Sequence, residues 1–307
     1  MHSTKISICY YSLPLMQYKN IALTARADLP EKEEILTKIK KIVKESGADL
    51  YIDPMRCADI ASLKNCKQYD SIKDVDLIIA VGGDGTILSV VREIEDYSIP
   101  ILSIHHGTLG FLTEVDADEI DTILPVMLKS GGNIDERLLL KIEIEENGKR
   151  KKIGDVLNEA VVNQGGISRL IDLYTKINGK ELTTFRSDGL IIATPTGSTA
   201  YSMAAGGAII HPHLTSHVTL LTPINPHNFK QKPIVIPGDQ EIEIEVLTKD
   251  NAYRTVEVNL TLDGQLHLPL QRGQKVLVST NKENIKFLRR RSDIFYERLR
   301  EKLGWAE

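Results

Sequence analysis

The sequence has few cysteines and no long apolar run. Its three cysteines, Cys9, Cys57 and Cys66, form neither an even disulfide framework nor a Cys-x-x-Cys pair. We therefore expect a reduced, cytoplasmic protein. No apolar run reaches the roughly 18 residues of a membrane span, and Met1–Leu15 lacks the basic start and apolar core of a signal peptide. The pattern predicts no membrane partner.

The sequence also lacks an excess of charge of one sign. The net charge is −4, so no overall field favours nucleic acid. We interpret Arg289–Arg291 as a solvated or interface face, because aromatic residues are not interleaved with it. His211, His213 and His217 have no carboxylate close in sequence, so we expect solvated histidines and assign no residue as a metal ligand.

The residues that are present fit a globular protein. Hydrophobic residues make up 42% and charged residues 26% of the 307-residue chain. This length allows roughly two domains with a sizeable core.

One stretch combines an apolar run with a glycine-rich turn. The run Asp76–Val81 predicts a buried parallel strand, Gly82-Gly83-Asp84-Gly85-Thr86 follows it, and Ile87–Ile94 has helical spacing. Glycines at a helix N-terminus let a phosphate approach free backbone N–H groups. A carboxylate there would repel phosphate unless a cation or a proton to be removed lies between them. The stretch indicates phosphoryl transfer with Asp84 as base or metal ligand, and the alternative is an ordinary turn with Asp84 as a helix cap.

The first part of the chain alternates predicted strands and helices, which is typical of a mainly parallel α/β domain. Strands are predicted at Lys5–Tyr11, Ala48–Ile52, from Asp76 and at Ile99–Ile104, and helices at Pro30–Glu45, Ile87–Ile94 and from Asp116 to Lys129. No Gly-x-Gly-x-x-Gly motif follows Lys5–Tyr11, so an ordinary dinucleotide-binding Rossmann site is not supported.

The character of the sequence changes near Asn133. Strands that alternate apolar and polar residues, with hairpin turns at Asn147-Gly148 and Asn178-Gly179, predict two packed antiparallel sheets up to Thr280. A last helix, capped by Ser292, presents Phe295, Tyr296, Leu299 and Leu303 on one face. We expect an α/β domain at residues 1–132, a β-sandwich domain at 133–280, and a segment 281–307 that returns to the first domain.

Three further motifs carry candidate site residues. The stretch Ser187–Ser202 runs from a strand into a small, hydroxyl-rich loop, which suits close backbone approach and neutral hydrogen bonds to a nucleotide. The alternative is an Ala/Gly-rich packed helix. Asn158-Glu159 at a strand end can hydrogen-bond to the two hydroxyl groups of a diol. The alternative is that both residues face solvent. Asp263-Gly264-Gln265 is a turn, and is part of a site only if it faces the cleft.

Taken together, these motifs resemble the ATP-NAD kinase family. The matching segments are Gly82–Thr86, Gly110–Glu114, Asn158-Glu159, Arg186–Gly189, Thr194–Ser202 and Asp263–Gln265. Lipid kinases and phosphofructokinases share the first motif, whereas the long Thr194–Ser202 segment is specific. The resemblance implies phosphorylation of the 2′-hydroxyl of the adenosine ribose of NAD by ATP, giving NADP. It also implies a Rossmann-like domain, a β-sandwich domain, a magnesium ion, and a homodimer or homotetramer.

The resemblance also assigns roles to residues. Asp84 would be the proton acceptor, Phe111 would lie by the adenine, and Arg169 would meet the pyrophosphate. The residues that it places at the NAD are Asp84, Gly85, Phe111, Asn158, Glu159, Arg169, Arg186, Asp188, Thr199, Ala200, Tyr201, Ser202, Ala204 and Gln265. Part of this set would come from a neighbouring subunit.

Some questions stay open at this level. Arg169 stands where relatives often have histidine, and the segments His105–Leu109 and Asn163–Gly166 depart from the family pattern. The donor is ATP or inorganic polyphosphate, and the acceptor is NAD or NADH. The competing hypotheses are a lipid or sphingoid-base kinase and a non-catalytic NAD sensor.

Overall fold

The computed structural model describes residues 18–69, 75–107, 109–166, 170–214, 217–247, 257–271, 273–291 and 294–305. The strand predicted at Lys5–Tyr11, the candidate site residue Arg169 and the helix cap Ser292 lie outside these residues. No helix in the described part of the chain is long and apolar enough to cross a membrane.

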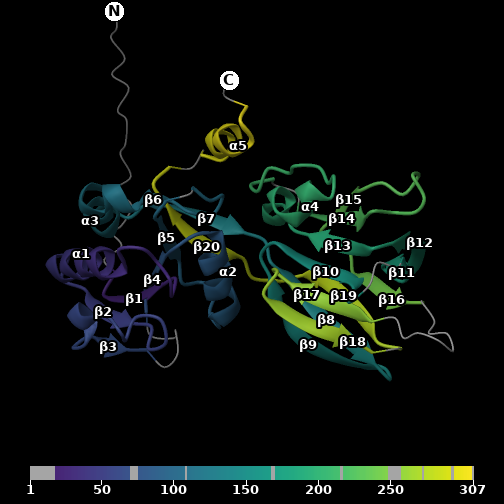
Figure 1. Ribbon diagram of the computed structural model, residues 1–307, viewed down its shortest axis with the longest axis horizontal. Helices are drawn as coiled ribbons and strands as arrows, with labels where there is room; N and C mark the ends of the chain where they lie inside the picture. Colours follow the sequence, from purple (N-terminus) through teal and green to yellow (C-terminus); the bar gives the residue numbers. More distant parts are fainter. Residues whose placement is uncertain are drawn as a thin grey trace, which may run out of the picture.

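The first sheet is mainly parallel and confirms the expected α/β region (Figure 1). Its strands run in the order β3 (Lys67–Gln68), β2 (Asp49–Ile52), β1 (Asn20–Ala25), β4 (Leu77–Val81), β5 (Ile101–His105), β20 (Ile285–Arg289) and β7 (Asn133–Arg137), with β6 (Val115–Asp116) also paired to β5. Because β7 belongs here, the chain changes sheet after Arg137. Strand β20 brings the C-terminal segment into the same sheet, parallel to β5.

The central strand β1 is not predicted by the sequence pattern. Its residues, Asn-Ile-Ala-Leu-Thr-Ala, include two alanines and so have weak strand preference. In the fold β1 pairs with both β2 and β4, and five of its six residues are buried. The formation of this strand therefore depends on its pairing with β2 and β4 and not on its local sequence.

Helices cover both faces of the first sheet. They are α1 (Lys32–Glu45), α2 (Asp84–Glu93) and α3 (Ile120–Ser130), with short 3₁₀ turns at Ala61–Leu63 and Ala117–Glu119. The apolar stripe of α1, which includes Leu36 and Ile39, packs in one core cluster with Leu23 and Leu124. Helix α2 packs in another cluster, against Ile78 and Ile101. The two clusters lie on opposite faces because successive strand residues alternate sides.

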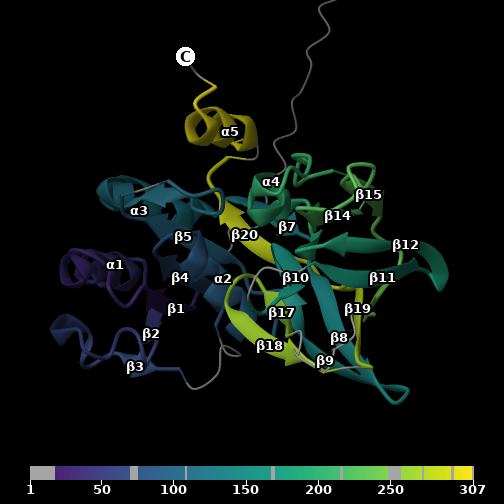
Figure 2. The same cartoon turned by 45° about the vertical axis from the view of Figure 1, so that its right-hand side comes forward.

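The second region consists of two antiparallel six-stranded sheets packed face to face, as predicted (Figures 1 and 2). One contains β15 (Ile234–Pro237), β14 (Val218–Ile224), β13 (Gly189–Ala193), β10 (Glu159–Gln164), β17 (Val258–Leu262) and β18 (Leu266–Leu270). The other contains β12 (Lys180–Ser187), β11 (Ile171–Ile177), β16 (Ile242–Val246), β19 (Lys275–Thr280), β8 (Leu140–Glu146) and β9 (Lys149–Val156). Alternating residues such as Val162, Leu173 and Ile244 fill the shared core.

The remaining helices are short. Helix α4 (Tyr201–Ala204) follows a 3₁₀ turn at Thr196–Thr199, and α5 (Phe295–Leu303) lies above the junction of the two regions in both views. The expected apolar face of α5 is only partly correct, because Leu299 is buried while Tyr296 is 55% exposed. The helix makes polar contacts with the first region instead.

The interpretation of Arg289–Arg291 as a solvated face was wrong for Arg289, whereas Arg290, Arg291 and His213 are exposed as expected. Arg289 is 2% exposed, because β20 is paired on both sides and the arginine donates to the Asp135 carboxylate and the Leu112 carbonyl. His213 has a carboxylate partner that is distant in sequence, with 2.6 Å between its Nε2 and Asp135 Oδ1. Neither pairing leaves a signal in local sequence.

Candidate active site

The order of the parallel strands places the glycine turn at a natural ligand site. The sheet runs outward in opposite directions from β1 and β4, and ligands of open α/β sheets bind at such a switch point, beyond the carboxyl ends of the strands. Arg26 follows β1, and Gly82–Thr86 follows β4 and opens α2. Gly82 has a φ of +152°, and a Cβ there would collide with the Thr86 side chain. Glycine is required at this position.

The pocket at this turn is lined mainly by polar residues and glycines. Its volume is about 450 Å³, and it is lined by Arg26, Ala27, Arg56, Gly83, Gly85, Thr86, Ser89 and Gln265. A Cβ at Gly83 or Gly85 would meet nothing within 4 Å, so the backbone there is open to a ligand. Arg56 is held by the carboxylates of Asp53 and Glu93, at 2.9 Å and 2.6 Å. Backbone donors, a helix N-terminus and two guanidinium groups fit a polyphosphate.

Asp84 occupies the first turn of α2, but it does not cap its own helix. Its carboxylate oxygens accept hydrogen bonds from the backbone N–H groups of Phe111 and Leu112, each at 2.9 Å. A Cβ at Gly110 would collide with this carboxylate, so glycine lets the loop approach. A carboxylate has about four acceptor positions. Asp84 is therefore oriented by the loop and keeps acceptor capacity for a further donor.

One turn links Asp84 to the other candidate residues. The Asp263 carboxylate accepts hydrogen bonds from the backbone N–H groups of Leu157, Asn158 and Glu159, at 2.8–3.0 Å. Two residues later, Gln265 Nε2 donates to the Gly85 carbonyl at 2.7 Å, and Gln265 Oε1 accepts from Ser89. The turn between β17 and β18 thus holds the Asn158-Glu159 strand end against the glycine turn of the first region.

Glu159 is buried in an environment that disfavours its charge. It is 6% exposed, and its Oε2 has no hydrogen-bond partner among the described residues. Burial, with a smaller contribution from the nearby Asp263 charge, raises the pKa of Glu159 to about 8. Burial also raises the pKa of Asp263, to about 6. At neutral pH Glu159 is therefore mainly protonated and can both donate to and accept from a ligand.

The Thr194–Ser202 segment packs against the same strand end. A Cβ at Gly197 would collide with the Asn158 backbone, and the Thr194 N–H donates to the Asn158 carbonyl at 2.9 Å. Tyr201 is 45% exposed, whereas Ser202 is fully buried and its hydroxyl lies 2.8 Å from that of Thr222. Within the segment, Tyr201 faces the outside and Ser202 faces the interior.

Arg186 and Asp188 lie apart from these residues. Strand β13 has Gly189 at one end and Ala193 at the other, and Ala193 pairs with Glu159 while Gly189 pairs with Asn163. At about 3.3 Å per residue, Asp188 is roughly 17 Å from the Glu159 end. Its carboxylate accepts from Asn225 Nδ2 at 3.0 Å, and Arg186 is exposed. One protomer does not gather the whole predicted set.

The structure also adds residues to the site. Arg26 was not predicted as a site residue because β1, the strand that it follows, was not predicted. Arg56 belongs to no motif identified in the sequence. Asp263 was interpreted first as a turn residue, and its three backbone acceptor contacts depend on the distant Leu157–Glu159 segment. In the sequence, only the residue type of Asp263 and the Asp-Gly-Gln spacing could have indicated that it belongs to the site.

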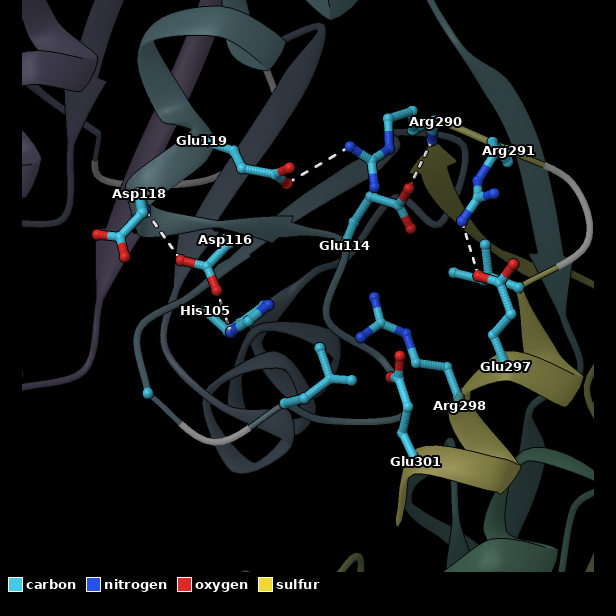
Figure 3. A pocket seen from close by; sticks show the side chains of 13 residues that line it. His105, Glu114, Asp116, Asp118, Glu119, Arg290, Arg291, Glu297, Arg298 and Glu301 are labelled. Atoms are coloured by element: carbon cyan, nitrogen blue, oxygen red, sulfur yellow. Dashed lines mark hydrogen bonds and ion pairs between the residues drawn. The ribbon is translucent and has the colours of Figure 1, made fainter. Parts of the chain in front are cut away.

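A second pocket, of about 660 Å³, is lined by Leu109 and Glu114, which flank the loop that holds Asp84. Figure 3 shows this pocket from close by. Its walls are the His105–Glu119 segment and α5, and charged side chains point into it from both. Burial lowers the pKa of His105, whose Nδ1 lies 3.7 Å from Asp116 Oδ2. Among the described residues no group of three or more His, Cys, Asp or Glu side chains could hold a metal ion.

The fold and site define a class: a two-region α/β and β-sandwich protein with a pocket at the glycine turn whose lining fits a phosphorylated ligand. Comparison with known families narrows this class. The ATP-NAD kinase N-terminal domain matches residues 21–132, and the ATP-NAD kinase C-terminal domain matches residues 157–290. This chain belongs to the ATP-NAD kinase family.

Individual relatives agree with the family match. The NAD kinase of Geotalea daltonii is 37% identical over 289 residues, covering 94% of this chain and 99% of its own. The NAD kinase of Syntrophotalea carbinolica is 36% identical over 290 residues, with the same coverage. The structure of yeast NADH kinase with NADH has a TM-score of 0.82 and 25% identity, covering 95% of this chain and 89% of that one. None of these comparisons supports a lipid or sphingoid-base kinase.

An archaeal structure supports the fold alone. The NAD kinase of Archaeoglobus fulgidus in complex with ATP has a TM-score of 0.72 at 21% identity, and covers 94% of this chain and all of that one.

Proposed function

We propose that this protein transfers the γ-phosphate of ATP to the 2′-hydroxyl of the adenosine ribose of NAD and so makes NADP. The observation that carries this proposal is the Asp263–Gln265 turn. It is hydrogen-bonded at one end to the Asn158-Glu159 strand end and at the other to the glycine turn that presents Asp84. A nucleoside held at the Asn158-Glu159 strand end therefore lies beside the Asp84 carboxylate.

In this proposal Asp84 is the catalytic base. A ribose hydroxyl is a poor nucleophile at neutral pH, and a carboxylate within hydrogen-bond reach removes its proton as the new bond forms. The 2′-oxygen forms a bond to the γ-phosphorus, the bond from that phosphorus to the β–γ bridging oxygen breaks, and the proton passes to Asp84. The Phe111 and Leu112 amides orient the carboxylate for this step.

The donor phosphates occupy the pocket at the glycine turn. Gly83 and Gly85 leave the backbone open there. The Arg26 and Arg56 guanidinium groups, which are paired with nearby carboxylates, line the pocket as hydrogen-bond donors. The described residues contain no ready-made metal cage. Magnesium commonly binds through substrate phosphates and one or two carboxylates, so the site fits an ion that enters with the donor, with Asp84 as the nearby carboxylate. Such an ion neutralises charge on the transferred phosphoryl group.

The acceptor lies along the Asn158-Glu159 strand end. Glu159 has an unpartnered buried oxygen, which a ribose hydroxyl satisfies. Phe111 is half-buried in the loop that holds Asp84 and is placed by the adenine, and the proposal also assigns Tyr201 and Ala204 of α4 to NAD. The proposal also places Arg169 at the pyrophosphate of NAD.

Arg186 and Asp188 reach NAD from a second copy of the chain. They lie at the opposite end of β13 from Glu159, so one protomer cannot bring both ends to one ribose. The assembly is therefore a homodimer or homotetramer. Mixing an Asp84→Asn variant with an Asp188→Ala variant regains activity if the site is shared. A fully active monomer in light scattering contradicts the shared site.

The reaction is tested by a product assay. NAD and NADH are offered as acceptors and ATP and polyphosphate as donors with magnesium, and NADP(H) is detected with a coupled dehydrogenase. We expect NADP from NAD and ATP, and an Asp84→Asn variant that still binds NAD but loses turnover by about 10³-fold. Binding of NAD without NADP formation by the unaltered protein would indicate a sensor instead. The proposed compartment is the cytoplasm.

A further inference from the structure

The loop that orients Asp84 is itself held by the C-terminal helix. Lys302 Nζ donates to the Leu109 carbonyl at 2.8 Å, and it lies 5.9 Å from the centre of the Phe111 ring. Arg298 Nη2, one turn earlier in α5, donates to the Thr113 carbonyl at 3.2 Å. The two contacts therefore bracket the Gly110–Leu112 segment, in which the Phe111 and Leu112 N–H groups donate to Asp84.

These contacts belong to a helix whose first turn packs on the second region, where the rings of Phe295 and Tyr296 lie 4.8 Å and 5.3 Å from the His211 ring. Leu299 is the buried residue of α5, and the pocket of about 660 Å³ separates the rest of the helix from the His105–Glu119 segment (Figure 3). In Figure 3 Arg298 and Glu301 project from α5 into this space. The helix is thus joined to the Asp84 loop by polar contacts to main-chain carbonyls and not by an apolar core.

We propose that α5 positions the catalytic carboxylate: Lys302, through the Leu109 carbonyl, and Arg298, through the Thr113 carbonyl, hold the loop whose amides orient Asp84. This inference rests on the proposed role of Asp84. Both α5 residues are positioning residues, since the contacts described above are to the loop. No family motif identified in the sequence includes them.

The physical reason is the direction of the loop amides. Two N–H groups fix the carboxylate plane, and a backbone shift of a fraction of an ångström changes where the acceptor oxygen points. The opposite side of this loop is partly open to the pocket. Arg289 Nη1 and Ser103 Oγ hold the Leu112 carbonyl, each at 2.8 Å, and the cationic side chains of α5 add a restraint at Leu109 and Thr113. The donor pocket has no lining residue from α5. Loss of a contact therefore affects turnover and leaves donor binding unchanged.

The test replaces one contact and keeps the helix. Lys302→Met removes the ammonium group but keeps an unbranched side chain, and Lys302→Arg keeps a donor. Arg300→Met is the matched control, because it removes one charge from an exposed position of the same helix. We expect Lys302→Met to lower kcat for NADP formation about three- to tenfold with KM for ATP unchanged, and Lys302→Arg to restore it. Arg300→Met keeps the activity of the unaltered protein.

A second readout does not depend on activity. Hydrogen–deuterium exchange of the peptide that contains Phe111 and Leu112 becomes faster in Lys302→Met, while exchange in β4 stays the same. Equal kcat and equal exchange in Lys302→Met overturn the inference, and so does an equal loss in Arg300→Met. If the unaltered protein makes no NADP, the proposed reaction fails, whereas the exchange result still tests the contact between α5 and the loop.

Discussion

Asp84 and Glu159 are both carboxylates of the candidate site, but the two regions of the molecule treat them in opposite ways. Asp84, in the α/β region, accepts two backbone N–H hydrogen bonds and stands beside an open pocket. Glu159, in the β-sandwich region, is buried with an unpartnered oxygen and a pKa raised to about 8. Environments that differ this way separate a base from a hydrogen-bonding group. We therefore assign proton removal to Asp84 and acceptor binding to Glu159.

After the loss of the Asp84 carboxylate itself, the largest effect should come from disturbing its orientation. Gly110→Ala places a methyl group against the Asp84 carboxylate and pushes it from the loop amides. We expect kcat to fall about 100-fold, because misplacement of a reacting group by about 1 Å has this cost. Steady-state kinetics with NAD and ATP measures it.

Gly154→Ala is the control for Gly110→Ala. A Cβ at Gly154 would make ordinary contact with Leu262, at 3.5 Å, so this variant should keep its activity. An active Gly110→Ala protein would contradict the assignment of Asp84 as the base.

The next effect concerns the link between the two carboxylates. In Asp263→Asn an NH₂ group replaces an oxygen that accepts backbone N–H groups, so a donor faces a donor. We expect the free energy of unfolding to fall by roughly 2–3 kcal/mol and KM for NAD to rise. Removing the Asp263 charge should also lower the pKa of Glu159. Denaturant unfolding measures the stability.

Asp239→Asn serves as the control for that change, since Asp239 is exposed. Unchanged stability in Asp263→Asn would show that its carboxylate does not hold the Leu157–Glu159 segment.

Glu159 predicts a particular pH dependence of stability. Its folded pKa of about 8 lies above the ordinary value of 4.5, so the folded protein keeps a proton that the unfolded chain releases. The stabilising contribution is complete below about pH 4.5 and is lost as the pH rises toward 8. Asp263, whose pKa is raised to about 6, acts in the same direction. Glu159→Gln should remove most of this fall, on the order of 4 kcal/mol, because each pKa unit corresponds to about 1.4 kcal/mol.

Unfolding of both proteins between pH 5 and 8 checks the sign. Glu45→Gln, at an exposed position on α1, should leave the slope unchanged. A parallel pH dependence in Glu159→Gln and the unaltered protein would show that Glu159 does not carry the raised pKa.

The smallest effect should come from Gln265. Gln265→Ala removes the hydrogen bonds to Gly85 and Ser89 that join the two regions. We expect about a fivefold rise in KM for ATP, which corresponds to roughly 1 kcal/mol. Gln271→Ala, at an exposed position after β18, is the control. If both variants have the same KM, Gln265 does not position the glycine turn.

Much of the fold could be predicted from pattern, with failures at identifiable places. The β4–α2 unit and the alternating strands were clear because their periodicity is local. Strand β1 was missed because its alanines have weak strand preference, and its burial between β2 and β4 is a property of the sheet. Arg289 looked solvent-exposed because its partners, Asp135 and Leu112, are far away in sequence.

The candidate site divides in the same way. Motif chemistry identified Asp84, Glu159 and Gln265, and the structure links them through Asp263. The structure separates Asp188 from these three residues, because Asp188 precedes the end of β13 that is opposite to the Glu159 end. A motif records which residues follow one another, and an antiparallel strand places its two ends far apart.

By itself, the sequence determined the elements whose physics is local. These are the glycine turn that admits a ligand to the backbone, the α/β and β-sandwich patterns, and the residue types able to bind a nucleotide. Only the tertiary structure decided that the Phe111 and Leu112 amides orient Asp84, that Glu159 is buried and protonated, and that α5 reaches the loop. Those features depend on desolvation and on hydrogen bonds between distant segments, which exist only after the chain has packed.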